Sequence, residues 1–309
     1  MPVAIHETLR NFLSLAKGER VPPHFIGSLA ACLFPNTSVV ETPVLYVIRE
    51  DSIDVFNREA SLKVDNVLGL VYGLVAQNRL EKLRFWFPPS LSGDQVRQVL
   101  LRLLPHTTKG LEPDSVLFSA LDSAYYMMVQ ELARKVEWKN DEGYRLYVLD
   151  AAVTITDVGI GSTWEIDGET FEMDAVHIAD APILLSQTEI PYDQDYMVTL
   201  INHPVVSKLI RVVRLVSTKQ PVAWSLVHCD FSIGLLSTLP EYRRKGLVQR
   251  ALSSTIVAYR DVAASHDGLL GIEPHCFVSV ENVPSQKLMA SVGFEYIPDK
   301  TFHWLAAVV

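Results

Sequence analysis

Three consecutive basic residues stand directly before a glycine in the segment LPEYRRKGLV, an arrangement that suits a bound phosphate group. Arg243, Arg244 and Lys245 precede Gly246 where a strand-like apolar run gives way to a helical pattern. Exposed N–H groups at a helix start carry partial positive charge, so cations there are unfavourable unless an anion lies nearby. A glycine lets the backbone approach that anion closely. The segment predicts a pyrophosphate site, with a solvated basic turn as the alternative for the three charges alone.

A second group of reactive side chains lies shortly upstream. In a strand, His228, Asp230 and Ser232 would share one face, where the imidazole or the carboxylate could take a proton from an amine, directly or through a water held by the serine. The amine could instead lose its proton without a dedicated side chain, and the three residues could be ordinary surface groups. The same alternation turns Cys229 to the opposite face, which predicts a buried structural cysteine rather than a thiol nucleophile; Cys276 is likewise expected in the core.

The second half of the chain supplies the elements that must hold these groups. Strand-like runs flank a turn at Lys219–Pro221, and a helical pattern follows from Gly246 to Tyr259. Further along come a short strand at 275–280, a helix at 283–292 ended by Gly293, and a closing strand at 303–309. The order of strand, strand, helix, strand, helix, strand indicates a layered structure of mixed class.

The first half alternates in a similar way. The patterns predict a helix at 4–17, a strand at 42–50, an apolar segment at 64–77, a helix at 93–104 ended by Pro105, a helix at 119–136 and a strand at 144–151. The stretch 156–170 is interpreted as a loop between the halves. Its Gly159 and Gly161 lack the third glycine of a dinucleotide loop, so they predict a turn. We expect an α/β (α+β) protein with two domains, residues 1–165 and 166–309.

Composition excludes several classes of function. Among 309 residues, 27 are Lys or Arg and 36 are Asp or Glu, and the net charge of −9 argues against affinity for nucleic acid through phosphate neutralisation. Three separated cysteines make neither a disulfide framework nor a zinc pair, and no acidic or histidine cluster has metal-ligand spacing. The longest apolar run, 67–76, is too short to span a membrane. With no secretory signal and a poor presequence, we expect an intracellular protein, cytoplasmic or mitochondrial.

The segment LPEYRRKGLV resembles the acyl-coenzyme A loop of the GNAT superfamily, whose usual form is Arg or Gln, two residues, Gly, one residue, then Gly or Ala. Arg243 and Gly246 match the first and central positions, whereas Val248 replaces the second small residue. Later residues resemble the superfamily's downstream Asn and its "GF" segment: Asn282, Ser285, Leu288 and Gly293-Phe294.

Within that superfamily, residues 177–309 resemble the glycine N-acyltransferase family. The resemblance includes TLPEYR followed by GLV, the strand PVAWSL at 221–226, and His177 where the family's C-terminal domain begins. For residues 1–150 it depends on total length and on the family's additional N-terminal domain. It implies a C-terminal GNAT-type fold with a central mixed β-sheet, and an N-terminal α/β domain that could itself be GNAT-like.

The resemblance also implies roles for named residues. Backbone N–H groups of the loop at 243–248, together with its arginines and lysine, would hold the pyrophosphate of acyl-CoA, with Leu247 and Val248 in the first helical turn. A backbone N–H near Thr238 or Leu239 would polarise the thioester carbonyl. Asn282 and Ser285 could bond the pantetheine arm, although Ser285 is equally interpretable as a helix N-cap.

Two catalytic positions depart from the resemblance. Ser232 stands where the glycine N-acyltransferases have a Glu, and Met289 stands where many GNAT enzymes have a Tyr acid; that Tyr is also absent from the glycine N-acyltransferases. The implied function is an acyl-CoA-dependent N-acyltransferase acting on a small amine, such as glycine or another amino acid, by direct attack in a ternary complex. Ser232 supports the alternative, a noncatalytic acyl-CoA-binding protein. A protein N-terminus, a lysine or an arylalkylamine is a third class of acceptor.

Overall fold

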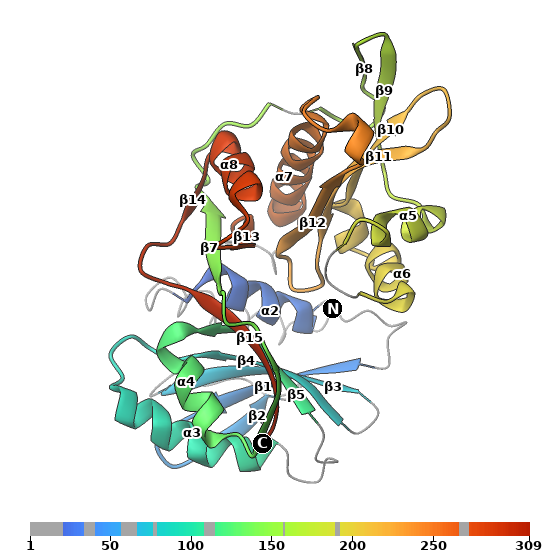
Figure 1. Ribbon diagram of the computed structural model, residues 1–309. Helices are drawn as coiled ribbons and strands as arrows, with labels where there is room; N and C mark the ends of the chain where they lie inside the picture. Colours follow the sequence, from blue (N-terminus) through green and yellow to red (C-terminus); the bar gives the residue numbers. More distant parts are fainter. Residues whose placement is uncertain are drawn as a thin grey trace. The chain divides into compact units, whose positions relative to one another are not determined.

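The computed structural model (Figure 1) describes residues 21–33, 41–56, 67–76, 79–107, 115–156, 158–188, 192–265 and 272–309. Contacts divide the chain into two units. Unit 1 comprises the chain up to Leu146 with Val278–Val283 and Tyr296–Val309, and unit 2 comprises Tyr147–Phe277 and Pro284–Glu295. The domain limits 1–165 and 166–309 stay a prediction, since the chain passes between these units more than once.

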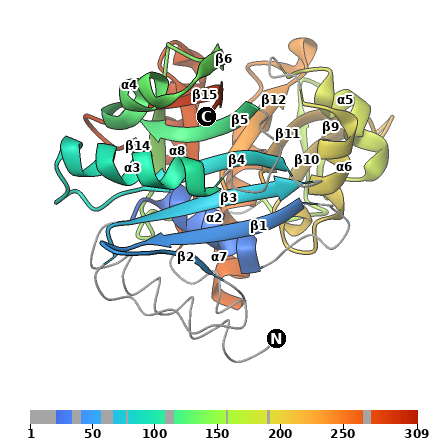
Figure 2. The same ribbon diagram turned by 90° about the horizontal axis from the view of Figure 1, so that it is seen from below.

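Unit 1 is a sheet with helices on both faces. Its helices are α2 (Pro23–Leu33), α3 (Gly93–Thr107) and α4 (Ser123–Leu132). Its strands are β1 (Glu41–Ile48), β2 (Ile53–Phe56), β3 (Gly69–Ala76), β4 (Arg79–Trp86), β5 (Ser115–Asp122), β6 (Lys135–Lys139) and β15 (Phe302–Val308). The order across the sheet is β2-β1-β3-β4-β5-β15-β6, and only β4 and β5 among these neighbours are parallel. Helix α2 lies on one face, and α3 and α4 lie on the other (Figures 1 and 2).

Unit 2 repeats this plan. Its helices are α5 (Ala181–Leu185), α6 (Gln194–Asn202), α7 (Leu247–Ser265) and α8 (Val283–Val292), with short 3₁₀ turns at Ile178–Asp180, Val206–Lys208 and Pro240–Tyr242. Its strands are β7 (Tyr144–Leu149), β8 (Thr163–Ile166), β9 (Glu169–Asp174), β10 (Arg211–Leu215), β11 (Pro221–Val227), β12 (Ile233–Thr238), β13 (His275–Ser279) and β14 (Phe294–Tyr296). The sheet order is β8-β9-β10-β11-β12-β13-β7-β14.

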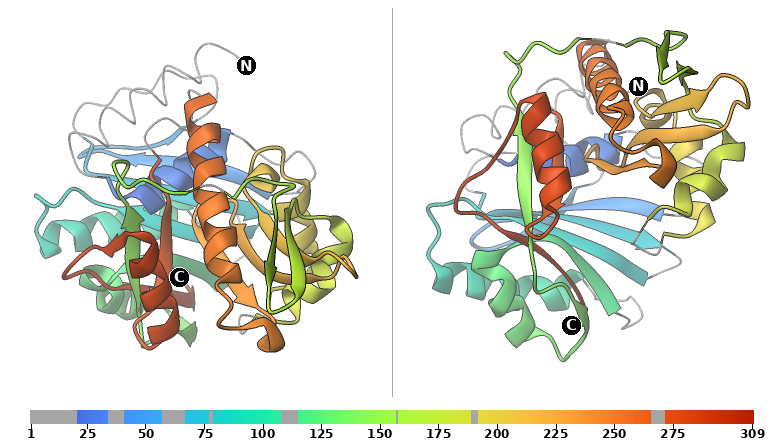
Figure 3. Two further views of the ribbon diagram at one scale, coloured as in Figure 1. Left: turned by 90° about the horizontal axis from the view of Figure 1, so that it is seen from above. Right: turned by 45° about the horizontal axis from the view of Figure 1, so that its top comes forward.

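The central strand of unit 2 is covered on both faces. All seven residues of β11 are buried, as expected for a strand between two helical layers. Helix α7 packs against β10, β11 and β12, while α5 and α6 lie on the other side of these strands (Figure 3). This arrangement brings the two candidate groups of the sequence to opposite ends of β12.

The sheet of each unit includes one strand that comes from the other half of the chain. In unit 1, the C-terminal strand β15 lies between β5 and β6; in unit 2, β7 lies between β13 and β14. In both sheets the inserted strand lies next to the second strand of the parallel pair, β5 in unit 1 and β13 in unit 2. Leu305 and Ala307 of β15 are fully buried in the core of unit 1. Unit 1 therefore depends on the last residues of the chain for its core.

A buried ion network fastens β9 and the turn after it to β10. Arg214 donates through Nε to Asp174 at 2.6 Å and through its two terminal nitrogens to Asp180 at 2.7 and 2.9 Å. Burial raises the pKa of Asp174, but the hydrogen bonds from Arg214 and the Ala175 N–H, together with the nearby positive charge, hold the net pKa below its usual value. His177, where the family resemblance begins, donates its backbone N–H to Asp180.

Most sequence-predicted elements are confirmed. The strands predicted at 42–50, 144–151, 275–280 and 303–309 correspond to β1, β7, β13 and β15, and the helices predicted at 246–259 and 283–292 correspond to α7 and α8. The mixed α/β class is confirmed as well. The predicted helix at 4–17 lies outside the described residues.

Three local predictions are wrong. The helix predicted at 119–136 starts only at Ser123, because residues before it form β5, which pairs with β15 far along the chain. Helix α3 continues through Pro105 to Thr107, so the proline lies in its last turn rather than ending it. The stretch interpreted as an interdomain loop contains β8 and the start of β9, which form a hairpin.

Replacing Leu305 tests how much β15 contributes to the stability of unit 1. Because Leu305 is fully buried, Leu305→Ala should lower the free energy of unfolding by about 2–5 kcal/mol. The matched substitution Leu101→Ala, on an exposed position of α3, should change it by no more than about 0.5 kcal/mol. Urea unfolding followed by circular dichroism measures both, and equal effects would show that β15 contributes little to unit 1.

Candidate functional site

The strands β12 and β13 separate soon after they meet. In the described chain they are paired in parallel at a single register position, Ile233 with Cys276. The register of β12 against β11 also shifts between Trp224 and Leu226, and Leu235 has a left-handed φ of 51°. Such a bulge bends a strand and interrupts its pairing. The carboxyl end of β12 is therefore directed away from β13.

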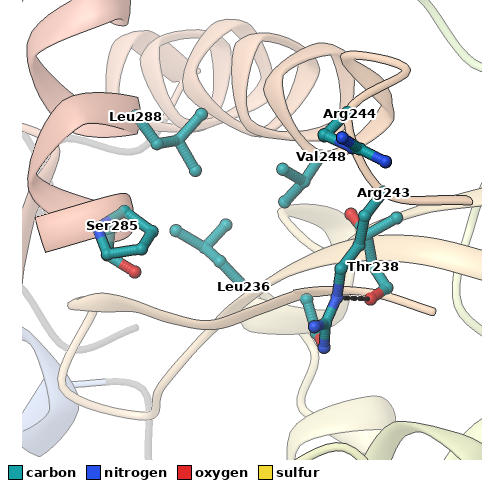
Figure 4. A pocket seen from close by; sticks show the side chains of 9 residues that line it. Leu236, Thr238, Arg243, Arg244, Val248, Ser285 and Leu288 are labelled. Carbon is teal, nitrogen blue, oxygen red and sulfur yellow. Dashed lines mark hydrogen bonds between the residues drawn. The ribbon is translucent and has the colours of Figure 1, made fainter. Parts of the chain in front are cut away.

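A pocket of about 280 Å³ lies at the carboxyl end of β12, lined by residues of β12, the loop after it, α7 and α8. The lining residues are Leu236, Ser237, Thr238, Arg243, Arg244, Val248, Pro284, Ser285 and Leu288. Figure 4 shows Leu236, Val248 and Leu288 pointing toward one another from three different elements. The two arginines lie at one end. The pocket thus combines an apolar middle with a basic end.

The basic end is made by a tightly turned loop. Arg244 and Gly246 both have left-handed φ angles, 66° and 71°, and the Nε of Arg243 donates to the Thr238 carbonyl at 3.3 Å. Helix α7 begins at the buried Leu247 and has no acidic residue in its first turn. Its N-terminal N–H groups and helix dipole favour an anion at this end of the pocket. The loop has the features predicted from LPEYRRKGLV.

Lys245 lies apart from the two arginines. Its Nζ is 2.9 Å from a carboxylate oxygen of Glu169 and 3.4 Å from one of Asp167, both on the β8–β9 hairpin. The hydrogen bond with Glu169 raises the pKa of Lys245, so the ammonium stays charged. Lys245 does not line the pocket and was predicted as a mobile cation around the phosphate. Its ion pairs attach the hairpin to the loop instead.

The two N–H groups predicted to polarise a thioester differ in their surroundings. The backbone N–H of Leu239 donates to the Val222 carbonyl at 2.9 Å, so the sheet uses it. Thr238 lies opposite Ala223 and lines the pocket. The bulge at Leu235, where pairing is interrupted, was not foreseen from the sequence.

The downstream residues are also divided. Ser285 and Leu288 line the pocket from α8, and Ser285 lies inside the helix rather than at its cap, because α8 begins at Val283. Asn282 belongs to unit 1, where its N–H closes a turn by donating to Ser279. Asn282 is not among the residues that line the pocket.

His228, Asp230 and Ser232 do not lie on a strand, which corrects the alternation argument. Strand β11 ends before His228 and β12 begins after Ser232, and the five residues between them form the hairpin turn. Phe231 there has a left-handed φ of 63°. The Ser232 hydroxyl donates to Asp230 at 2.6 Å, while the His228 Nδ1 lies 2.6 Å from the Tyr196 hydroxyl. The three residues therefore form two separate polar pairs.

An aromatic group around His228 was missed by sequence reasoning. The rings of Tyr192 and Tyr196 are stacked at 4.9 Å with 15° between their planes, and both lie about 6 Å from the His228 ring. Asp193 caps α6 by accepting the Tyr196 backbone N–H. The segment YDQDY, with tyrosines four residues apart and a capping Asp, carried a signal for this arrangement.

The two described cysteines differ in exposure. Cys229 is half-buried rather than buried, and the turn conformation removes the face argument that was applied to it. Cys276 is buried as expected, and burial raises the pKa of its thiol. Among the residues that the structure describes, His, Cys, Asp and Glu side chains do not gather into a group that could hold a metal ion.

The corresponding place in unit 1 has different side chains. Strands β4 and β5 are parallel and joined through α3, as β12 and β13 are joined through α7. In unit 1, however, Phe87 follows β4 and packs against Phe85 and Tyr125 at ring distances of 6.0 and 5.3 Å. Ser92 and Gln95 cap the start of α3 by exchanging hydrogen bonds. Aromatic filling and a self-capped helix leave this end unsuited to an anion.

Comparison with solved structures agrees with this architecture. An X-ray structure of a Drosophila protein aligns with a TM-score of 0.61 at 15% identity, covering 97% of this chain and 88% of that one. A tandem GNAT protein from the clavulanic acid biosynthesis pathway, solved without AcCoA, aligns with a TM-score of 0.55 at 12% identity, covering 98% and 95%. The chain has the GNAT fold.

The repeated order of strands and helices in the two units agrees with a tandem GNAT arrangement. No protein-family profile matches the sequence, and no curated protein matches it. The subfamily resemblance therefore stays a hypothesis. Within the described residues, no helix has the length and apolar character needed to cross a membrane.

Replacing Gly246 tests the loop. Gly246→Glu should reduce binding of coenzyme A by at least about tenfold, because a carboxylate would enter an anion site. Gly161→Glu is the matched control, since Gly161 also has a positive φ (86°) and open space around it but lies outside the pocket. Both variants should lose similar stability from backbone strain. Calorimetric titration measures binding, and equal affinities of the two variants would contradict the loop assignment.

Proposed function

We propose that the protein is an acyl-CoA-dependent N-acyltransferase that transfers an acyl group from a thioester to a small amine. The observation that carries this proposal is the pocket at the end of β12, which has two arginines at one end and aliphatic side chains in its middle. The GNAT fold supports the same conclusion. Acyl-CoA would be a substrate, and the reaction would proceed by direct attack in a ternary complex.

The pocket matches the parts of the donor in order. The pyrophosphate would lie on the loop at 243–248, between the two arginines and the start of α7. The pantetheine arm would follow the aliphatic side chains of Leu236, Val248 and Leu288 toward the bulge. A backbone N–H at the bulge near Leu235 would donate to the thioester oxygen.

Contacts within the turn favour His228 as the general base. Asp230 accepts hydrogen bonds from both the hydroxyl and the backbone N–H of Ser232, and a serine hydroxyl is a poor base near neutral pH. Histidine is the side chain type that most often accepts a proton near neutral pH, and His228 lies beside Gly234, two residues before the pocket residue Leu236. Along a strand, two residues span roughly 7 Å, so Gly234 and the pocket residue Leu236 are about that far apart. A small amine bound beside His228 could therefore reach a thioester in the pocket.

Free-thiol release tests the reaction. Acetyl-, benzoyl- and longer acyl-CoA donors should each be incubated with and without a panel of amines, including glycine. Amine-dependent release of the thiol is the expected result, and it should disappear in Gly246→Glu but persist in Gly161→Glu. Donor binding without release for any amine would favour the alternative, a noncatalytic acyl-CoA-binding protein.

A single donor site per chain is expected despite the two similar units. The aromatic filling near Phe87 and the acidic Asp94 in the first turn of α3 both oppose a bound pyrophosphate in unit 1. Titration with coenzyme A should give a stoichiometry of about one, and Gly246→Glu should remove it. Two equivalent sites would show that unit 1 also binds the donor.

A further inference from the structure

We infer that Tyr192, Tyr196 and His228 form the acceptor subsite, and that it takes a small amine without a carboxylate, preferably one carrying an aryl group. This inference rests on the proposed transfer reaction and narrows its acceptor. It departs from the amino-acid acceptor that the sequence resemblance implies. Three observations carry it: the aromatic geometry, the local charge and the position of Gly234.

The aromatic rings offer a surface for an aryl-alkyl ammonium. Tyr192 and Tyr196 stack almost in parallel, and the His228 ring is tilted by 38° and 34° to them. All three residues are half-buried, so the group is packed and still reaches solvent. Aromatic faces attract ammonium groups through their quadrupoles and stack favourably with other rings.

The charges around this group suit a cation and oppose an anion. Helices α5 and α6, strands β11 and β12 and the turn between these strands contain no Lys or Arg. Asp195 of α6, Asp193 at the N-cap of that helix and Asp230 of the turn contribute three carboxylates. An ammonium ion would gain from these groups, whereas the carboxylate of an amino acid would meet no cation on these elements.

Gly234 allows the imidazole to occupy its position. A Cβ added at Gly234 would collide with Nε2 of His228, so the ring lies where any other residue would place its side chain. The opposite nitrogen, Nδ1, is held by the Tyr196 hydroxyl at 2.6 Å. When Nδ1 carries the hydrogen and donates it to that oxygen, Nε2 is the basic nitrogen. Gly234 and Tyr196 are thus positioning residues for His228.

The chemical step follows from this arrangement. The bound ammonium gives one proton to Nε2 of His228, and the neutral amine attacks the thioester carbonyl carbon. The C–N bond forms, the C–S bond breaks, and the thiolate leaves. After the attack the nitrogen is positively charged, and it gives one further proton, which the thiolate takes up. The imidazolium returns its proton to solvent. The products are the amide, the free thiol and one proton.

Matched amines test the acceptor class. Thiol release should be compared between phenethylamine and phenylalanine, and between methylamine and glycine, which differ within each pair by a carboxylate. We expect kcat/KM to be at least about tenfold higher for the member without the carboxylate, because a charge left unpaired on binding is costly. Equal or better turnover of the amino acids would overturn the inference and leave the proposed transferase intact. Release from no amine would overturn both.

Variants test the residues separately. Tyr192→Leu should raise KM for phenethylamine by about fivefold and leave that for methylamine unchanged, since only the aryl amine uses the ring. The control is Tyr296→Leu, at an exposed tyrosine at the end of β14, which should change neither value. An equal rise in both KM values for Tyr192→Leu would contradict an aryl subsite.

Kinetic constants distinguish the proposed base, His228, from the residues that position it, Gly234 and Tyr196. His228→Gln should lower kcat by about a hundredfold with donor binding retained. Gly234→Ala and Tyr196→Phe should lower kcat more than they raise KM, because they misplace or reorient the imidazole. Gly93→Ala, where an added Cβ meets nothing within 4 Å, is the control for Gly234→Ala. Unchanged kcat in His228→Gln would exclude His228 as the base and overturn this part of the subsite.

Discussion

The candidate site depends on the separation of two parallel strands. Within the described residues, β12 and β13 pair at a single position, Ile233 with Cys276, so the carboxyl end of β12 is separated from β13. The crossover helix α7 must start close to that end, which brings its N-terminal N–H groups beside the gap. Helix α8 closes the other side with Ser285 and Leu288. A bend in one strand therefore produces both the basic end and the apolar channel of the pocket.

The two units show that this topology alone does not make a binding site. Unit 1 has the same parallel pair joined by a helix, yet Phe85, Phe87 and Tyr125 fill the corresponding place. The start of its helix is capped by its own Ser92 and Gln95, so those N–H groups already have acceptors. The fold supplies the opening, and the side chains at a few positions decide whether a ligand can use it.

Features of the site that depend on consecutive residues were predictable, whereas contacts between residues far apart in the sequence were not. The loop around Gly246 and the start of α7 are encoded in consecutive residues, so charge and helix periodicity were sufficient to find them. The role of Lys245 depends on Glu169, which is far away in the sequence. The prediction that His228, Asp230 and Ser232 share one face of a strand was wrong for a related reason. Side chains alternate between two faces only inside a strand, and the chain reverses at Phe231, which has a left-handed φ.

By itself, the sequence determined the mixed α/β class, the helices α7 and α8, the strands β1, β7, β13 and β15, and the basic loop before α7, because each follows from neighbouring residues. Tertiary structure decided which strand pairs with which. It inserted β15 beside β5, placed the first residues of the helix predicted at 119–136 in a strand, and brought Tyr196 against His228 across 32 positions. These outcomes depend on contacts between distant segments. The free energy gained by burying such contacts exceeds the local helix or strand propensity, and the contacts leave no pattern among neighbouring residues.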